Sequence, residues 1–241
     1  MKKLLFLLAL IFFGSLSAQE LNGSWKLVAV NGEPVTNEDS VRIYQDGYFA
    51  AGTKEKRTNR FMHAEGGEYT LTDGYSEVYD FYTQDSAMVG QQRNYEIDVS
   101  KDEMLLHNAA GDEMTWKKIS DNENDLSRNW VITGRKRNGK ISRSTPGARR
   151  TIKILGGDRF QWVAFNSDTG EFFGTGGGTY SAKDGEYVEN IEFFSRDDSR
   201  AGAILPFQYE LKDGEWHHSG KSSRGEEMYE IWSPYEEAFE K

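Results

Sequence analysis

An internal repeat of roughly 110 residues is the feature that most constrains how this chain can fold. The segment Gly66-Gly67-Glu68-Tyr69 recurs as Gly177-Gly178-Thr179-Tyr180, an offset of 111 residues, and His107 matches His218 at the same offset. Ordered matches of this kind extend over a whole unit, with offsets that drift by only a few residues. A period of this length is too long for a solenoid and predicts two tandem domains.

The repeat places the domain boundaries. We predict one domain over residues 20–119 and a second over 126–234. The polar segment 120–125 between them has the composition of a linker. Residues 235–241 are predicted to form a frayed turn or a short helix.

The N-terminus has the pattern of a secretory signal peptide over residues 1–18. Two lysines precede an apolar run of ten residues, Leu4 to Phe13, which a small-residue segment ending at Ala18 follows. The run is too short to cross a bilayer, which takes about 20 residues. We therefore expect a periplasmic or extracellular protein that keeps no membrane span once the signal peptide is removed. An N-terminal membrane anchor is the alternative.

Composition removes several classes of function. The chain has no cysteine, which excludes disulfide scaffolds, thiolate metal sites and thiol catalysis. Its formal net charge of −10 argues against nucleic acid as a partner. His217 and His218 are adjacent, so on a strand they point to opposite faces. Since no His-x-His or HExxH spacing occurs either, we predict no metal and no cofactor.

Within each repeat the apolar residues alternate with a period of two. The segments Tyr95–Val99, Arg159–Ala164 and Phe207–Lys212 all show this pattern, and turn sequences such as Lys183-Asp184-Gly185 separate such runs. The pattern predicts an all-β chain of antiparallel strands. Closure into two tandem meander β-barrels of about eight strands each is expected because it leaves no bare edges. A pair of open sandwiches is the alternative.

The start of each repeat carries a family resemblance. The sequence Leu21-Asn22-Gly23-Ser24-Trp25 resembles the Gly-x-Trp opening of lipocalin-like (calycin) barrels, and the second repeat keeps the tryptophan as Trp130 but lacks the glycine. Together with the runs 159–162, 174–180 and 193–197, it is similar to lipocalin-like secreted proteins of Bacteroidota-type bacteria. That family is largely uncharacterised. The resemblance implies tandem lipocalin-like barrels with a binding role, and it supplies no catalytic residues.

One face of a predicted strand combines a carboxylate with large apolar side chains. Glu189 shares its face with Tyr187 and Phe193, and Glu77 has a matching setting in the first repeat. If this face is the barrel interior, each carboxylate must be hydrogen-bonded, paired with a cation or protonated. It would either orient a ligand or serve a purely structural ion pair. The predicted ligand-binding residues are Phe160, Trp162, Tyr187, Glu189, Phe193, Tyr209 and His218.

The segment 134–150 carries seven basic residues and no acidic one. The equivalent loop of the first repeat contains Glu33, Glu38 and Asp39. Opposite charges at matching positions could dock the two domains or gather an anionic glycan, and a solvated loop is the alternative. Because no aromatic residues alternate with the basic ones, the segment does not predict nucleic-acid binding.

We therefore expect a secreted protein that binds a small apolar or mixed-polarity ligand in an aromatic-lined barrel cavity. No Gly-x-Ser-x-Gly elbow occurs and no catalytic residue is assigned, so a binding protein is favoured over an enzyme. An enzyme acting on glycans or lipids with Glu189 as acid/base is one alternative. A non-catalytic envelope module that binds a partner through strand edges or the basic segment is the other.

Overall fold

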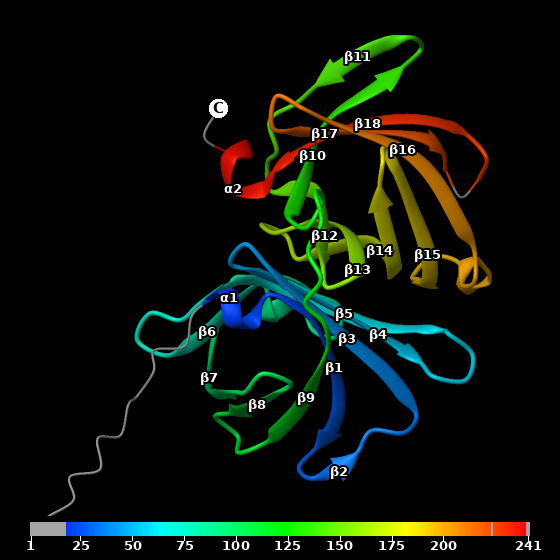
Figure 1. Cartoon of the computed structure of the whole chain (residues 1–241). Coiled ribbons are helices and arrows are strands. Elements are labelled where there is room, and N and C mark those ends of the chain that lie inside the picture. The colour runs from blue at the N-terminus through cyan, green and yellow to red at the C-terminus, as the bar shows by residue number, and fades with distance from the viewer. Residues whose placement is uncertain (1–17, 223, 240–241) are drawn as a thin grey trace, which may run out of the picture.

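The protein consists of two closed antiparallel β-barrels in tandem, each built from eight strands that follow one another as a meander (Figure 1). The computed structural model describes residues 18–222 and 224–239. The predicted signal peptide lies outside this range except for Ala18. In the part of the chain that the structure describes, no helix has the length and apolarity to cross a membrane. The fold prediction is confirmed, and the open sandwiches are wrong.

The first barrel closes by pairing its first strand with its last. A two-residue strand, β2 (Glu33–Pro34), forms a small hairpin on β1 outside the barrel wall. The wall strands are β1 (Gly23–Val30), β3 (Glu38–Gln45), β4 (Tyr48–Glu55), β5 (Phe61–Thr70), β6 (Tyr75–Tyr82), β7 (Gln92–Val99), β8 (Glu103–Asn108) and β9 (Glu113–Ser120).

The second barrel repeats this plan, with β11 (Lys140–Arg143) as the additional hairpin strand on β10. Its wall strands are β10 (Asn129–Arg137), β12 (Arg149–Gly156), β13 (Arg159–Asn166), β14 (Glu171–Lys183), β15 (Glu186–Phe194), β16 (Ile204–Lys212), β17 (Glu215–Lys221) and β18 (Glu227–Pro234). The helical segments are short: α1 (Ala18–Leu21), η1 (Ser86–Met88), η2 (Asp198–Arg200) and α2 (Tyr235–Ala238).

Tight turns make the meander possible. Asp184 and Gly185 have φ angles of 52° and 81°, and Asp213 and Gly214 have 53° and 78°. Two consecutive positive φ angles are typical of the type I′ turn, which matches the right-handed twist of the paired strands. Asp and Asn tolerate this conformation better than most residues, and Gly adopts it without steric cost.

Strand pairing shows that the two barrels are structural repeats. Arg42 pairs with Ala51 in the first barrel, and Lys153 pairs with Trp162 in the second, at the predicted offset of 111. Both barrels also have a bulge at the same glycine pair, Gly66/Gly67 and Gly177/Gly178. The two barrels therefore match in strand register and also in the position of this β-bulge.

The match of His107 with His218 is wrong by one residue. Trp116 lies opposite Met104, and Trp232 lies opposite Trp216, so the residue two positions further in each strand is Leu106 in the first barrel and His218 in the second. A shift of one residue exchanges the two faces of a strand. The side chain of His107 is accordingly 38% exposed, whereas that of His218 is 1% exposed.

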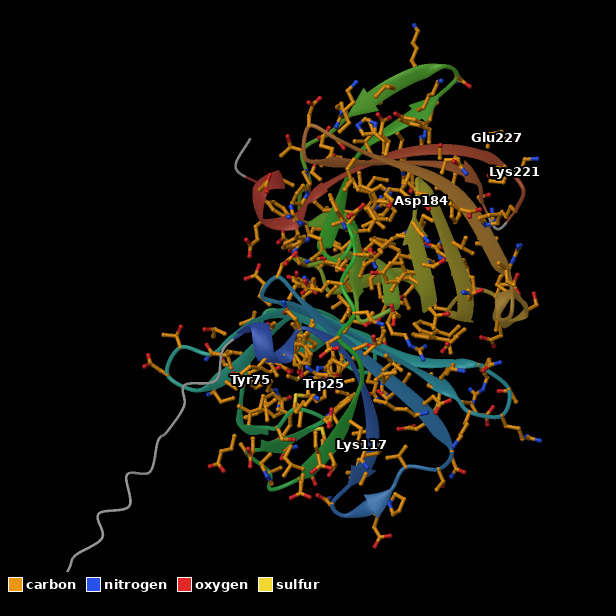
Figure 2. The ribbon with its side chains drawn as sticks, in the orientation of Figure 1. Trp25, Tyr75, Lys117, Asp184, Lys221 and Glu227 are labelled. Atoms are coloured by element: carbon orange, nitrogen blue, oxygen red, sulfur yellow. The ribbon has the colours of Figure 1, made fainter. Side chains whose placement is uncertain are left out.

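A tryptophan fills one end of each barrel. The indole nitrogen of Trp25 donates a hydrogen bond of 2.7 Å to the carbonyl oxygen of Leu21, and Trp130 donates one of 2.9 Å to Leu126. Figure 2 shows Trp25 together with Tyr75 inside the first barrel. Both tryptophans are buried, and each belongs to the apolar core of its own barrel.

A third apolar core joins the two barrels. It combines Ile43 and Phe81 of the first barrel with Ile154 and Phe165 of the second, and the rings of Phe81 and Phe165 lie 5.2 Å apart. Tyr235 and Ala238 of α2 are also buried in it, so the predicted tail forms a packed short helix. Because β12 and β13 lie against strands of the first barrel, their outer faces are mainly apolar, with Arg150 and Gln161 as polar exceptions.

A polar contact stabilises the same interface. Arg150 in the basic segment forms an ion pair of 2.8 Å with Asp80, and the hydroxyls of Tyr48 and Tyr235 donate to the same carboxylate oxygen. Docking by the basic segment is thus confirmed for Arg150, but its partner lies in β6. The partners expected from sequence do not take part, since Asp39 pairs with lysines of its own barrel.

We predict that Phe165→Ala lowers the free energy of unfolding by about 3–5 kcal/mol, the usual cost of removing a buried phenylalanine ring. Ile204→Ala is the matched control, because Ile204 is 66% exposed and its loss should cost less than about 0.5 kcal/mol. Urea unfolding of both variants measures the difference. Equal stability of the two variants would show that the shared core contributes little.

Candidate functional site

The second barrel encloses a cavity of about 710 Å³ that opens at one end. Its wall combines apolar and aromatic side chains with a similar number of polar and charged ones, and most of the strands contribute to it. The lining side chains include Ile132, Arg135, Arg137, Arg149, Lys153, Trp162, Ala164, Phe173, Glu189, Ile191, Phe194, Arg196, Phe207, His218, Met228, Glu230 and Trp232.

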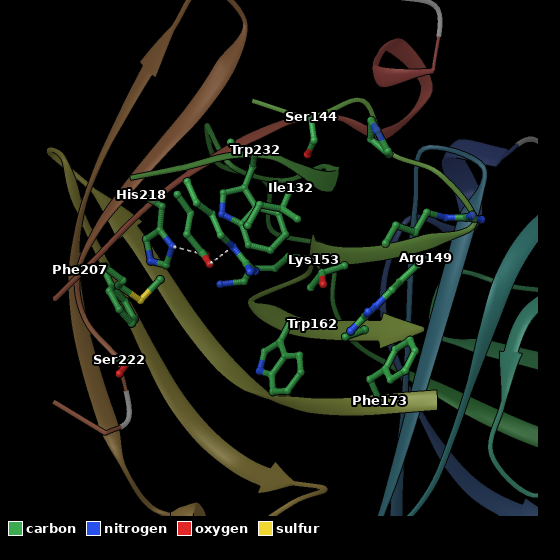
Figure 3. Close-up of a pocket in the computed structure, with 18 of the residues that line it drawn as sticks. Ile132, Ser144, Arg149, Lys153, Trp162, Phe173, Phe207, His218, Ser222 and Trp232 are labelled. Atoms are coloured by element: carbon green, nitrogen blue, oxygen red, sulfur yellow. Dashed lines mark ion pairs between the residues drawn. The ribbon is translucent and has the colours of Figure 1, made fainter. Parts of the chain in front are cut away.

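Strand β12 runs along the length of the cavity, from the exposed Arg149 to the buried Lys153. Arg149, Thr151 and Lys153 all line it, because every second residue of the strand points inward. At about 3.3 Å per residue, the backbones of Arg149 and Lys153 are about 13 Å apart along the strand. Figure 3 shows Arg149 and His218 on opposite sides of the cavity, with Trp162 between them.

A buried ion pair occupies the inner part of the cavity. The ammonium group of Lys153 lies 2.7 Å from Oε1 of Glu189, and the hydroxyl of Tyr187 donates to the same oxygen at 3.0 Å. Lys153 also lies 5.2 Å and 5.3 Å from the ring centres of Trp216 and Trp232. Rings around an ammonium group stabilise its charge in a place that water reaches poorly. Glu189 is therefore held as a fixed acceptor in the wall.

A second polar group lies beside this pair. Nδ1 of His218 is 3.8 Å from Glu230, beyond hydrogen-bond distance, and Arg135 lies 3.3 Å from the other oxygen of that carboxylate. Neither ring nitrogen of His218 has a hydrogen-bond partner among the described residues. Burial, reinforced by the positive charge of Lys153, lowers the pKa of His218, so its ring is neutral near pH 7. A neutral imidazole offers one donor and one acceptor.

Matching positions in the first barrel explain why the second one is hollow. There Arg42 replaces Lys153 and reaches two carboxylates, those of Glu65 and Glu77, each at 2.6 Å. The strand register puts Gly176 at the position of Glu65. In the same way Ile191 takes the position of Tyr79, which donates to Glu77. Lys153 and Ile191 are shorter than the arginine and tyrosine that they replace, and both line the cavity, whereas the space at Gly176 is occupied by the rings of Trp162 and Phe194.

The structure brings three of the predicted site residues to the cavity wall: Trp162, Glu189 and His218. Phe160 and Tyr187 are buried in the core beneath it, and Tyr209 packs partly buried against the same core.

Phe193 is the exception, because it lies outside the barrel. The bulge opposite Gly177 and Gly178 places Glu192 and Phe193 together on the outer face. The Phe193 ring stacks on Phe61 of the first barrel at 6.0 Å. Phe194 takes the inward position instead and meets Trp162 edge-on at 5.4 Å. A strict period of two across the strand could not reveal this change of face.

Sequence reasoning missed the arginines that line the open end of the cavity. Arg149 belongs to the basic segment, whose charge pattern predicts docking, glycan binding or a solvated loop, and Arg196 follows β15. Arg149 lies four residues before Lys153 on the same strand, so alternation places both side chains on the inner face, and this pattern could have indicated Arg149. No signal pointed to Arg196, since it lies beyond the bulge.

Neither a protein-family model nor a curated protein matches this sequence. Among the residues that the structure describes, no group of three or more His, Cys, Asp or Glu side chains could hold a metal ion. The geometry of the cavity is therefore what indicates a function.

We predict that Lys153→Met destabilises the protein by about 3 kcal/mol or more, because it leaves the buried carboxylate of Glu189 without its cation. Adding Glu189→Gln to this variant should restore part of the loss, since the unpaired charge is then gone. Chemical denaturation of the two variants and the parent protein measures this coupling. A double variant no more stable than Lys153→Met would show that the pair is not energetically linked.

The lowered pKa of His218 predicts a loss of stability on the acid side. The unfolded chain takes up this proton near pH 6.5, whereas the folded one resists protonation, so the contribution is intact above that pH and declines below it. The charged groups that face the ring are Lys153, Glu189 and Glu230.

The matched variant is His218→Leu, the residue that the first barrel has at this position. Between pH 8 and about 5.5, the parent protein should lose more unfolding free energy than the variant. Urea unfolding across this range gives both curves, and parallel curves would contradict the prediction.

Proposed function

We propose that this protein binds a small molecule of apolar or mixed polarity in the cavity of its second barrel, as a lipocalin-like binding protein. The observation that carries the proposal is the difference between the repeats. The positions that Arg42 and Tyr79 fill in one barrel hold Lys153 and Ile191 in the other, and both of these line a cavity of about 710 Å³. Sites for small molecules commonly enclose about 300–1,000 Å³.

The composition of the wall supports binding through contact area. Trp162 and Phe194 form an edge-on pair, and Phe207 packs on His218 with their ring centres 4.3 Å apart. Aromatic side chains supply large apolar contacts, and a few fixed polar groups orient what is bound. Glu189 and His218 are such groups, and both lie in the wall.

The first barrel acts as a rigid base in this proposal. The hydrogen bonds of its central side chains are made within the barrel, for example from Tyr75 and Tyr79 to Glu77. Together with the predicted signal peptide, the proposal describes a binding protein of the periplasm or the cell exterior. It assigns no chemical step to Glu189, because the carboxylate is held by Lys153 and Tyr187.

Binding of the neutral fluorescent probe N-phenyl-1-naphthylamine tests the proposal. We expect saturable binding at one site per chain, and at least about tenfold weaker binding in Ala164→Phe, which fills the cavity from β13. Ala110→Phe adds the same ring at an exposed turn of the first barrel and should bind the probe like the parent protein.

Circular dichroism confirms that both variants are folded. Native mass spectrometry of protein from its own host extends the test to whatever molecule co-purifies with it. Unchanged probe affinity in Ala164→Phe, or no saturable binding at all, would refute binding in this cavity.

A further inference from the structure

Three arginines, Arg137, Arg149 and Arg196, form what we call the cationic mouth of the cavity. They lie where β10 ends, where β12 begins and just after β15 ends. Among residues 18–222 and 224–239, no carboxylate lies within ion-pair distance of any of the three. The other cations of the cavity are all paired: Arg135 with Glu230, Arg150 with Asp80, and Lys153 with Glu189.

Two of these arginines are held on the same residue. The guanidinium of Arg149 lies 4.5 Å from the ring centre of Phe173, and Nε of Arg196 donates a hydrogen bond of 2.6 Å to the carbonyl oxygen of Phe173. Figure 3 shows Arg149 beside Phe173, across the cavity from His218. The two positive charges are therefore close together at one side of the opening.

A glycine makes room for this arrangement. Gly174 has a φ angle of 152°, and a Cβ atom there would lie 2.6 Å from Nε of Arg196. Any side chain at this position would push the guanidinium away from the backbone. The first barrel has His63 in place of Gly174 and Gln84 in place of Arg196.

The charge of the mouth is not a requirement of the fold. The strand register places Glu38 of the first barrel at the position of Arg149, so the same site carries the opposite charge there. The whole chain has a formal net charge of −10, so these unpaired arginines concentrate positive charge locally on an acidic protein. Unpaired cations beside a poorly hydrated wall favour an anion, which they bind through charge-assisted hydrogen bonds.

Resting on the proposed function, we propose that the ligand is an amphipathic anion whose carboxylate or phosphate group binds Arg149 and Arg196 at the mouth. Its apolar body lies inward along Trp162 and Phe194, over the distance of about 13 Å between Arg149 and Lys153. The arginines fix the orientation, with the charged end outward. The polar groups around His218 meet the inner end of the molecule.

Displacement of N-phenyl-1-naphthylamine by three single-chain compounds tests this inference. Decanol, decanoate and decyl phosphate share one apolar chain and differ in the head group, and all are used below their micelle concentrations. We expect one or both anions to displace the probe at about tenfold lower concentration than decanol, the gain from a charge-assisted hydrogen bond. The better of the two anions identifies the head group as carboxylate or phosphate.

The variant Arg149→Gln/Arg196→Gln should reduce this advantage to about twofold or less, since neither of the two arginine charges beside Phe173 then remains. Lys183→Gln/Lys212→Gln is the matched control, because it removes two exposed charges at the far ends of β14 and β16 and should keep the advantage. Displacement is normalised to the probe affinity of each variant, and circular dichroism checks the fold. Added salt should weaken the anions more than decanol.

The outcomes separate the two proposals. If the probe binds but decanol competes as well as the anions, the anionic ligand is overturned and the binding function stands. An anion advantage that survives in the arginine variant overturns the role of the cationic mouth. If the probe does not bind the parent protein, the binding function itself fails and this inference fails with it.

Discussion

A buried cation paired with a carboxylate stands at the centre of each barrel, and the remaining architecture is arranged around it. In one repeat the cation is Arg42, which bridges Glu65 and Glu77; in the other it is Lys153, which has only Glu189. A buried charge must be compensated, so the strands that carry each pair have one acceptable register. The longer arginine helps to fill the interior of its barrel, and the shorter lysine leaves a cavity in its own.

A few inward side chains account for the difference between the two structural repeats. Both keep the same meander, the same bulges and a tryptophan at one end. What differs is the volume and charge of residues that point inward, such as Ile191 in place of Tyr79 and Arg149 in place of Glu38. One repeat is thereby specialised for packing and the other encloses a cavity.

Much of the fold could be predicted from the sequence, because alternation and turns are local signals that the repeat shows twice. The site was less accessible. Trp162, Glu189 and His218 follow the period of two and were placed on the cavity wall, whereas Phe193 lies after a bulge that depends on Gly177 and Gly178. Similarly, His107 was matched one residue away from the true equivalent of His218. Such errors arise where one inserted residue exchanges the faces of a strand.

The position of β12 and β13 has a mechanical consequence. Each presents alternate side chains to two different environments: Lys153 and Trp162 face the cavity, while Ile154 and Phe165 are clamped against the first barrel. The outer face of this side of the cavity packs against the first barrel, so β12 and β13 cannot move outward without disrupting the interface between the two barrels. Any widening to admit a bulkier guest falls to β16 on the opposite wall, where the outward side chains Pro206, Gln208 and Glu210 are exposed.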